Sequence, residues 1–120
     1  SVAIAARESR KALRLRLACD GHEVVLDEQR QQVTIGRADD NDLVIRGNLI
    51  SRLHARVEIS RNKFMVTDQS TNGTFVKKAD GEEAFVRRDT IQIKGEGLIG
   101  LGKVPDESSP QTIRYLCEEP

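Results

Sequence analysis

Hydroxyl side chains crowd one polar stretch of this chain, residues 68–74. Ser70, Thr71 and Thr74 surround Asn72-Gly73, and apolar segments lie on either side. An Asn-Gly pair supplies the positive φ angles of a tight turn, so this stretch is predicted to be a hairpin loop between two strands. Hydroxyl groups can donate hydrogen bonds to an anion as well as cap the backbone. The cluster therefore indicates a binding site for an anionic group.

Two earlier segments place further polar side chains at the ends of apolar runs. Gly36-Arg37 ends the alternating run 33–35, and Ser51-Arg52-Leu53-His54 directly precedes the alternating run 55–59. A receptor for a phosphate group needs fixed hydrogen-bond donors and at least one guanidinium, which can donate two parallel hydrogen bonds. Loops that carry an arginine and several hydroxyls can supply both.

These three segments, Gly36-Arg37, Ser51-Arg52-Leu53-His54 and Ser70-Thr71-Asn72-Gly73-Thr74, resemble at this spacing the motifs of the forkhead-associated (FHA) domain. With the strand pattern on both sides, the resemblance covers residues 13–117. It implies a β-sandwich that binds phosphothreonine peptides and catalyses no reaction. Phosphothreonine carries about −1.5 to −2 charges at neutral pH and has three strong acceptor oxygens.

The resemblance also implies a role for five binding residues. Arg37 would contact the phosphate and the peptide backbone, Ser51 would donate its hydroxyl to a phosphate oxygen, and Thr71 would donate from the opposite loop. Arg52 stands where the family often contributes another phosphate contact. Asn72 would hydrogen-bond the peptide main chain, because an amide can both donate and accept.

Four further residues are expected to serve specificity and architecture. Leu49 stands where family members read the third residue after the phosphothreonine, and its apolar side chain would weakly favour an apolar or small residue there. Gly36 and Gly73 permit tight turns of the backbone. His54 can tie two loops together by hydrogen bonds at either ring nitrogen.

Short stretches of the alternating or apolar kind typical of strands recur along the chain between Gly, Asn and Asp turns. About eleven are predicted, at 13–17, 22–26, 33–36, 43–45, 55–59, 63–67, 74–76, 84–86, 90–93, 98–101 and 113–116. Each has an apolar face that a second sheet must cover, so the pattern predicts an all-β, two-sheet antiparallel sandwich. In the family's fold the first and last strands are neighbours, so both ends of the domain should lie away from the binding loops.

Composition excludes several other classes of protein. The 120 residues suffice for one domain, and nineteen basic and nineteen acidic residues leave no net charge to attract a nucleic acid. No apolar run approaches the ~20 residues needed to cross a bilayer. The chain is therefore expected to be a soluble, cytoplasmic module that binds neither nucleic acid nor membrane.

Metal and redox chemistry are not expected either. Cys19, Cys117, His22 and His54 lack the short paired spacings of zinc ligands. Two reduced thiols are favoured over a disulfide in a cytoplasmic domain. No cofactor is predicted.

Residues 1–12 are interpreted as a linker from a preceding region and residues 13–120 as the FHA domain, monomeric in isolation. The chain begins with Ser1 and its only methionine is Met65, which favours a regulatory segment cut from a longer signalling protein. Segments 98–102 and 113–118 look similar to FHA modules at the ends of bacterial nucleotide cyclases. The expected partner is a threonine-phosphorylated protein or peptide, in trans or from the parent chain.

Two alternatives stay open. A module that uses the same loops but ignores phosphate would keep Arg37 and Ser51 and would bind an unmodified partner. An enzyme is the other alternative, because Ser51, His54 and Asp68 are the residue types of a hydrolase triad. The sequence has no nucleophile elbow and nothing that indicates an oxyanion hole, so catalysis is not expected.

Overall fold

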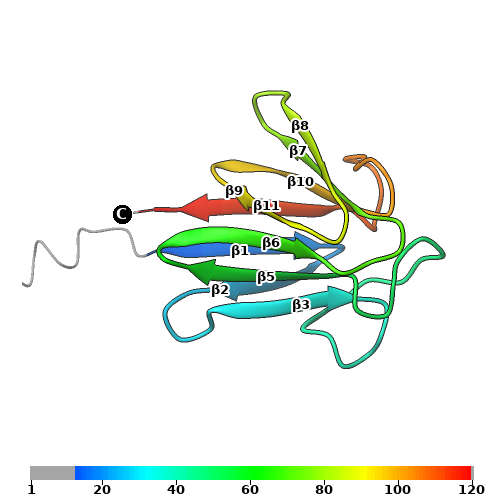
Figure 1. Cartoon of the computed structure of the whole chain (residues 1–120), viewed down its shortest axis with the longest axis horizontal. Helices are drawn as coiled ribbons and strands as arrows, with labels where there is room; N and C mark the ends of the chain where they lie inside the picture. Colours follow the sequence, from blue (N-terminus) through cyan, green and yellow to red (C-terminus); the bar gives the residue numbers. More distant parts are fainter. Residues whose placement is uncertain (1–12, 120) are drawn as a thin grey trace, which may run out of the picture.

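The computed structural model describes residues 13–119, and the strands of this range form two sheets (Figure 1). The first sheet has the order β2-β1-β11-β10-β7-β8, and its strands are β1 (Arg14–Cys19), β2 (His22–Leu26), β7 (Thr74–Lys78), β8 (Glu83–Val86), β10 (Glu96–Leu101) and β11 (Ile113–Glu118). The second has the order β4-β3-β5-β6-β9, and its strands are β3 (Gln32–Gly36), β4 (Leu43–Val44), β5 (Ala55–Ser60), β6 (Lys63–Asp68) and β9 (Thr90–Ile93). Each predicted strand corresponds to an observed one, and the predicted sandwich is confirmed.

Alternation along the strands builds the core between the two sheets. On β1, Leu15 and Leu17 are fully buried, whereas Arg14 and Arg16 stay partly exposed on the other face. The largest fully buried side chains come from both sheets: Leu15, Leu17, Leu26, Ile99 and Ile113 from the first, and Ile35, Phe64 and Ile93 from the second. Burial of one such side chain stabilises a fold by roughly 1.5–3 kcal/mol.

The pairing of strands sets which end of the sandwich carries the loops. β1 pairs antiparallel with β11, with Leu17 opposite Tyr115, so the first and last strands are neighbours as predicted. The end of β11 lies at the left of Figure 1, and the loops that follow β3 and β6 lie at the right. β3 and β4 form the one parallel pair within residues 13–119; their register places Gly36 opposite Val44. The linker predicted for residues 1–12 lies outside the described residues.

A hairpin turn forms at Asp20-Gly21 but not at Asn72-Gly73. Asp20 and Gly21 join β1 to β2 with φ angles of 48° and 80°, as a two-residue turn with two left-handed positions requires. The hairpin predicted at Asn72-Gly73 is wrong, because β6 pairs with β5 and β9 in one sheet while β7 pairs with β10 and β8 in the other. Residues 69–73 instead carry the chain from one sheet to the other.

Several features of the described range bear on the excluded classes of protein. No helix within residues 13–119 is long and apolar enough to cross a bilayer. Cys19 and Cys117 carry free thiols, and the Cys19 thiol lies 3.1 Å from the carbonyl oxygen of Pro110, to which it donates. In the same range, no three metal-ligating side chains gather in one place.

Candidate functional site

Three loops meet at one end of the sandwich: residues 37–42 after β3, residues 45–54 before β5, and residues 69–73 after β6. The Arg37 amide donates a hydrogen bond of 2.9 Å to the Ser51 carbonyl. The Thr71 amide donates one of 3.2 Å to the Ser51 hydroxyl oxygen. Ser51 in the middle loop therefore contacts both of the other loops, and the three motif segments lie together.

The Arg37 guanidinium is fixed at one of its three nitrogens. Its Nε–H group donates a hydrogen bond of 3.1 Å to the Ile50 carbonyl. The two terminal nitrogens of this exposed side chain have no partner among residues 13–119. Gly36 allows this arrangement, because a Cβ atom at that position would lie 2.2 Å from the Arg52 carbonyl oxygen. Arg37 thus presents a positioned pair of free donors.

Arg52 shares an open hollow with Arg37. Its carbonyl accepts hydrogen bonds from the Ala38 amide and the Asn41 side chain, at 3.1 and 2.7 Å, while its side chain stays exposed. The hollow has a volume of about 810 Å³ and is lined by Arg37, Ala38, Asp39, Asp40, Arg46, Gly47, Asn48 and Arg52. Sequence reasoning missed Arg46, because Arg46-Gly47-Asn48 reads as an ordinary turn.

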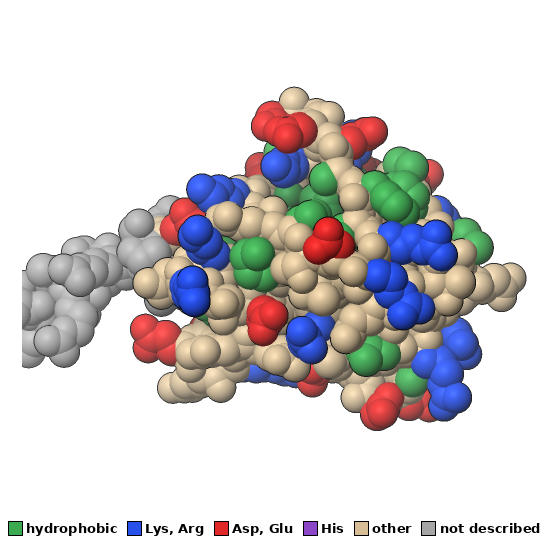
Figure 2. All heavy atoms as spheres, in the orientation of Figure 1, with side chains coloured by type: hydrophobic (Ala, Val, Ile, Leu, Met, Phe, Trp, Pro, Cys, Tyr) green, Lys and Arg blue, Asp and Glu red, His purple; other side chains and the backbone are tan. Residues whose placement is uncertain are grey.

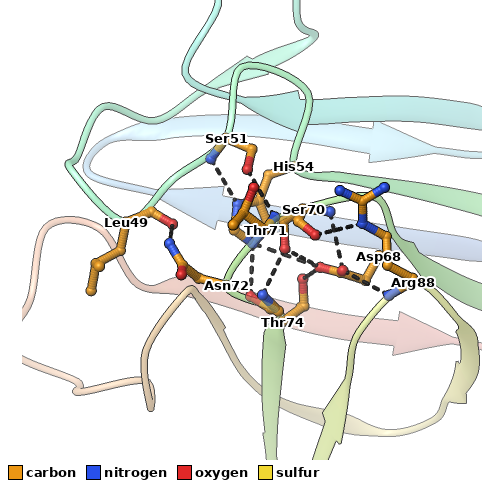
Figure 3. A network of polar contacts seen from close by, with 10 residues as sticks. Leu49, Ser51, His54, Asp68, Ser70, Thr71, Asn72, Thr74 and Arg88 are labelled. Carbon is orange, nitrogen blue, oxygen red and sulfur yellow. Dashed lines mark hydrogen bonds and ion pairs between the residues drawn. The ribbon is translucent and has the colours of Figure 1, made fainter.

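Thr71, Asn72 and Leu49 form a second part of the site, where the Asn72 side chain points toward the Leu49 carbonyl (Figure 3). The Thr71 and Asn72 side chains are exposed, and the Asn72 amide nitrogen donates a hydrogen bond of 3.1 Å to the Leu49 carbonyl. The Leu49 side chain is 44% exposed, so it is accessible to a ligand. An amide with spare hydrogen-bonding groups therefore lies next to a half-exposed apolar side chain.

His54 lies beneath the loops and is fully buried. Its Nδ1 atom accepts a hydrogen bond of 3.1 Å from the Ser51 amide, so Nε2 carries the proton and donates to the Gly73 carbonyl at 2.8 Å. Burial lowers the pKa of His54, because a charged imidazole would lose its water. The ring is therefore neutral and ties two loops together.

The same geometry argues against a hydrolase triad. His54 accepts from the backbone amide of Ser51, whereas a triad requires the imidazole to contact the serine hydroxyl. His54 Nε2 lies 3.8 Å from the Asp68 carboxylate, beyond hydrogen-bond distance. Both side chains are fully buried, so no substrate reaches them.

Asp68 is the centre of a buried network at the start of the third loop (Figure 3). Its Oδ1 accepts from the hydroxyls of Ser70 and Thr74, each at 2.7 Å, and its Oδ2 accepts from the amides of Ser70 and Arg88, at 3.1 and 3.0 Å. Burial by itself would raise the pKa of Asp68, but the hydrogen bonds from Thr74, Arg88 and Ser70 outweigh it and hold the pKa below its usual value. A charged carboxylate thus organises the loop.

This network corrects the interpretation of the hydroxyl cluster. Ser70 and Thr74 are fully buried, and both donate their hydroxyl protons to Asp68. Neither can donate to an external anion. Of the three hydroxyls that suggested an anion site, only Thr71 is exposed.

Gly73 and Arg88 complete the packing of this loop. Gly73 has a φ angle of 89°, and a Cβ atom there would lie 2.3 Å from the Phe85 ring, so only glycine is accommodated. Its amide donates to the Ser70 hydroxyl at 2.7 Å. Arg88 lies in the β8–β9 turn and its Nε–H group donates to the Ser70 carbonyl at 2.8 Å. Sequence reasoning missed Arg88, because no motif marks the turn that contains it.

A sandwich whose loops present guanidinium and hydroxyl donors at one end has the groups that an anion-binding module needs. The model of the FHA domain family matches residues 33–96, more than half of the chain. The chain therefore belongs to the FHA family of phosphothreonine-binding modules.

Curated proteins that are named for the FHA domain are similar to this chain in sequence. The FHA domain-containing protein FhaB of two Mycobacterium tuberculosis strains is 38% identical over 81 residues, which cover 63% of this chain and 51% of FhaB. The chain thus spans about half the length of these curated relatives.

Solved structures show the same fold at low sequence identity. The first FHA domain of Rv1747 from Mycobacterium tuberculosis superposes with a TM-score of 0.68 at 18% identity, over 88% of this chain and 97% of that chain. The N-terminal FHA domain of Rad53p from S. cerevisiae, solved with a phosphothreonine peptide, gives 0.60 at 18% identity, over 86% and 90% of the two chains.

Proposed function

We propose that this chain binds threonine-phosphorylated segments of partner proteins through Arg37, Ser51, Arg52, Thr71 and Asn72, and that it catalyses no reaction. The observation that carries the proposal is the position of Ser51, which is hydrogen-bonded both to the Arg37 loop and to the Thr71 loop. A single phosphate group beside the Ser51 hydroxyl is therefore within the reach of side chains from all three loops.

The phosphate contacts follow from the donors that the protein leaves unused. The Ser51 hydroxyl oxygen accepts from the Thr71 amide, so the hydroxyl proton remains to be donated to a phosphate oxygen. Arg37 is anchored through Nε, which leaves two terminal nitrogens for charge-assisted hydrogen bonds to the phosphate. Arg52 adds a second guanidinium from the lining of the same hollow.

The peptide main chain is held on the other side of the site. Asn72 uses one N–H group on the Leu49 carbonyl, and its other N–H group and its carbonyl oxygen remain for the backbone of the bound peptide. The exposed Leu49 side chain would contact the third residue after the phosphothreonine. Gly36, Gly73 and His54 support these residues and contact no ligand.

The wider setting belongs to the same proposal. The chain acts as a monomeric cytoplasmic module, consistent with its free thiols, and its partner is another protein or another part of its own parent chain. The relatives described above give no support to a nucleotide-cyclase parent, since they are named for the FHA domain itself.

The test begins with a phosphothreonine peptide library screened against the protein to select a ligand. Calorimetric titration then compares that peptide with its unphosphorylated form. We expect binding only of the phosphorylated peptide, and a loss of about 100-fold in affinity in Arg37→Ala, because a charge-assisted pair is lost at the centre of the site. Lys63→Ala, which removes a positive charge from an exposed residue at the start of β6, is the matched control. Equal affinity for the two peptides would overturn the proposal in favour of a phosphate-independent module.

A further inference from the structure

The hollow beside the phosphate site contains a third arginine that the proposed phosphothreonine contacts do not use. Arg46 follows β4 and lines the hollow together with Arg37 and Arg52. Figure 2 shows Lys and Arg side chains gathered at the loop end of the molecule, at the lower right of that view. Two acidic residues, Asp39 and Asp40, line the same hollow, so the arginines outnumber the aspartates.

The Arg46 side chain forms one ion pair in this structure, and that pair is exposed to solvent. Its Nη2 atom forms an ion pair with the Asp39 carboxylate, and the two side chains are 68% and 83% exposed. Water screens both charges of such a pair, so the pair is weak. A doubly charged phosphate can therefore replace the singly charged carboxylate of Asp39 as the partner of Arg46.

The backbone of Arg46 has a partner of its own, the Gln111 side chain. The Arg46 carbonyl accepts a hydrogen bond of 2.6 Å from the side-chain amide nitrogen Nε2 of Gln111. The next residue, Gly47, packs so closely on the same side chain that a Cβ atom there would lie 2.4 Å from it. The base of Arg46 is thus positioned at the hollow while its guanidinium is available to a ligand.

The hollow is also larger than one phosphate group requires. A water molecule takes up about 30 Å³ of liquid volume, and a phosphate group occupies the space of only a few water molecules. The hollow has a volume of about 810 Å³ and is open to solvent. Successive residues of an extended peptide advance by about 3.3 Å, so a neighbouring side chain of the same ligand can enter it.

We propose that this hollow binds a second phosphorylated side chain of the same peptide and that Arg46 is the residue that contacts it. This inference rests on the proposed phosphothreonine binding, because the first phosphate must place the peptide across Ser51. The preferred ligand is then a segment that carries two phosphates within a few residues. A carboxylate in place of the second phosphate would bind less well, since it has one charge instead of about two.

The test uses three versions of the selected peptide, with phosphothreonine alone, with an added phosphoserine, and with an aspartate at the phosphoserine position. The added group is moved through the three positions on either side of the phosphothreonine. At the best position we expect the second phosphate to raise the affinity of the protein about five- to tenfold in calorimetric titrations, and the aspartate to raise it less.

Variants then assign the gain to Arg46. We expect Arg46→Ala to abolish the gain while binding of the singly phosphorylated peptide changes by less than about twofold. Lys63→Ala should keep the gain, and Asp39→Asn should increase it, because Arg46 loses its competing partner. If no phosphopeptide binds at all, the proposed function itself fails. If the singly phosphorylated peptide binds but the second phosphate adds nothing, or if Arg46→Ala and Lys63→Ala reduce the gain equally, only the role of Arg46 is overturned.

Discussion

The polar residues at the loop end form two layers that differ in how far the protein itself satisfies them. The inner layer is buried and consists of His54, Asp68, Ser70 and Thr74, whose side chains all have hydrogen-bond partners. The rim consists of Arg37, Ser51, Thr71 and Asn72, which are exposed or half-buried and keep donors without a partner. The inner layer fixes the loops, and only the rim has groups left for a ligand.

The contrast is sharpest between two threonines of the same segment. Thr74 is the first residue of β7, and its hydroxyl donates to the buried Asp68 carboxylate. Thr71, three residues earlier, has an exposed side chain. A buried hydroxyl must be hydrogen-bonded inside the protein, because leaving it unpaired is costly. Residue type therefore does not decide which hydroxyl can bind an anion; burial does.

Removal of the inner carboxylate should have the largest effect. Asp68→Ala leaves two buried hydroxyls and two amides without their acceptor, and we expect the free energy of unfolding to fall by about 3 kcal/mol or more. Urea denaturation measures the change. Asp40→Asn, at an exposed position, is the control and should change it by no more than about 0.5 kcal/mol. A loss in Asp68→Ala as small as in this control would show that the network does not hold the loops.

A rim residue should show the opposite behaviour. Ser51→Ala removes a phosphate donor and the acceptor of the Thr71 amide, and we expect about a tenfold loss of phosphopeptide affinity by calorimetric titration. The free energy of unfolding should fall by less than about 1 kcal/mol, because the exposed Thr71 amide can bind water instead. A variant that unfolds easily but binds normally when folded would place Ser51 in the inner layer.

The strands could be predicted from the sequence because they depend on a local signal. Alternation such as Leu15 and Leu17 against Arg14 and Arg16 fixes both a strand and its buried face. The Asp20-Gly21 turn was predictable for the same reason, since it joins two neighbours in one sheet. Asn72-Gly73 carries an equally strong local signal, but the strands on either side pair elsewhere, and no local pattern records that.

The candidate site likewise contains residues that the sequence indicated and residues that it did not. The motifs that carry Arg37, Ser51 and Thr71 indicated which three loops belong to the site. In the structure these loops are joined by hydrogen bonds. The contributions of Arg46 and Arg88 depend on residues distant in sequence, Gln111 for Arg46 and Asp68 for Arg88. Such partners follow only from the packing of the whole domain, so sequence reasoning had no means of finding them.

The smallest expected effect is a pH dependence of the free energy of unfolding that arises from His54 in the inner layer. Burial lowers the pKa of His54 in the folded state, so the unfolded chain binds a proton more readily. The free energy of unfolding should therefore be constant above the unfolded pKa of about 6.5 and fall below it, by at most about 1.36 kcal/mol per pH unit. In the folded state a proton on Nδ1 would in addition face the Ser51 amide, which is itself a donor.

Urea denaturation at pH 7.5 and 5.5 measures this effect. His54→Asn should be less stable at both values, but the difference between them should shrink, whereas His22→Asn, at an exposed position, should leave the difference unchanged. The lowered pKa of Asp68 acts in a separate window, since its contribution to stability is lost only as pH falls below about 3.9, the unfolded value. A difference that persists in His54→Asn would mean that some other group senses pH, and the inner layer would then not depend on a neutral imidazole.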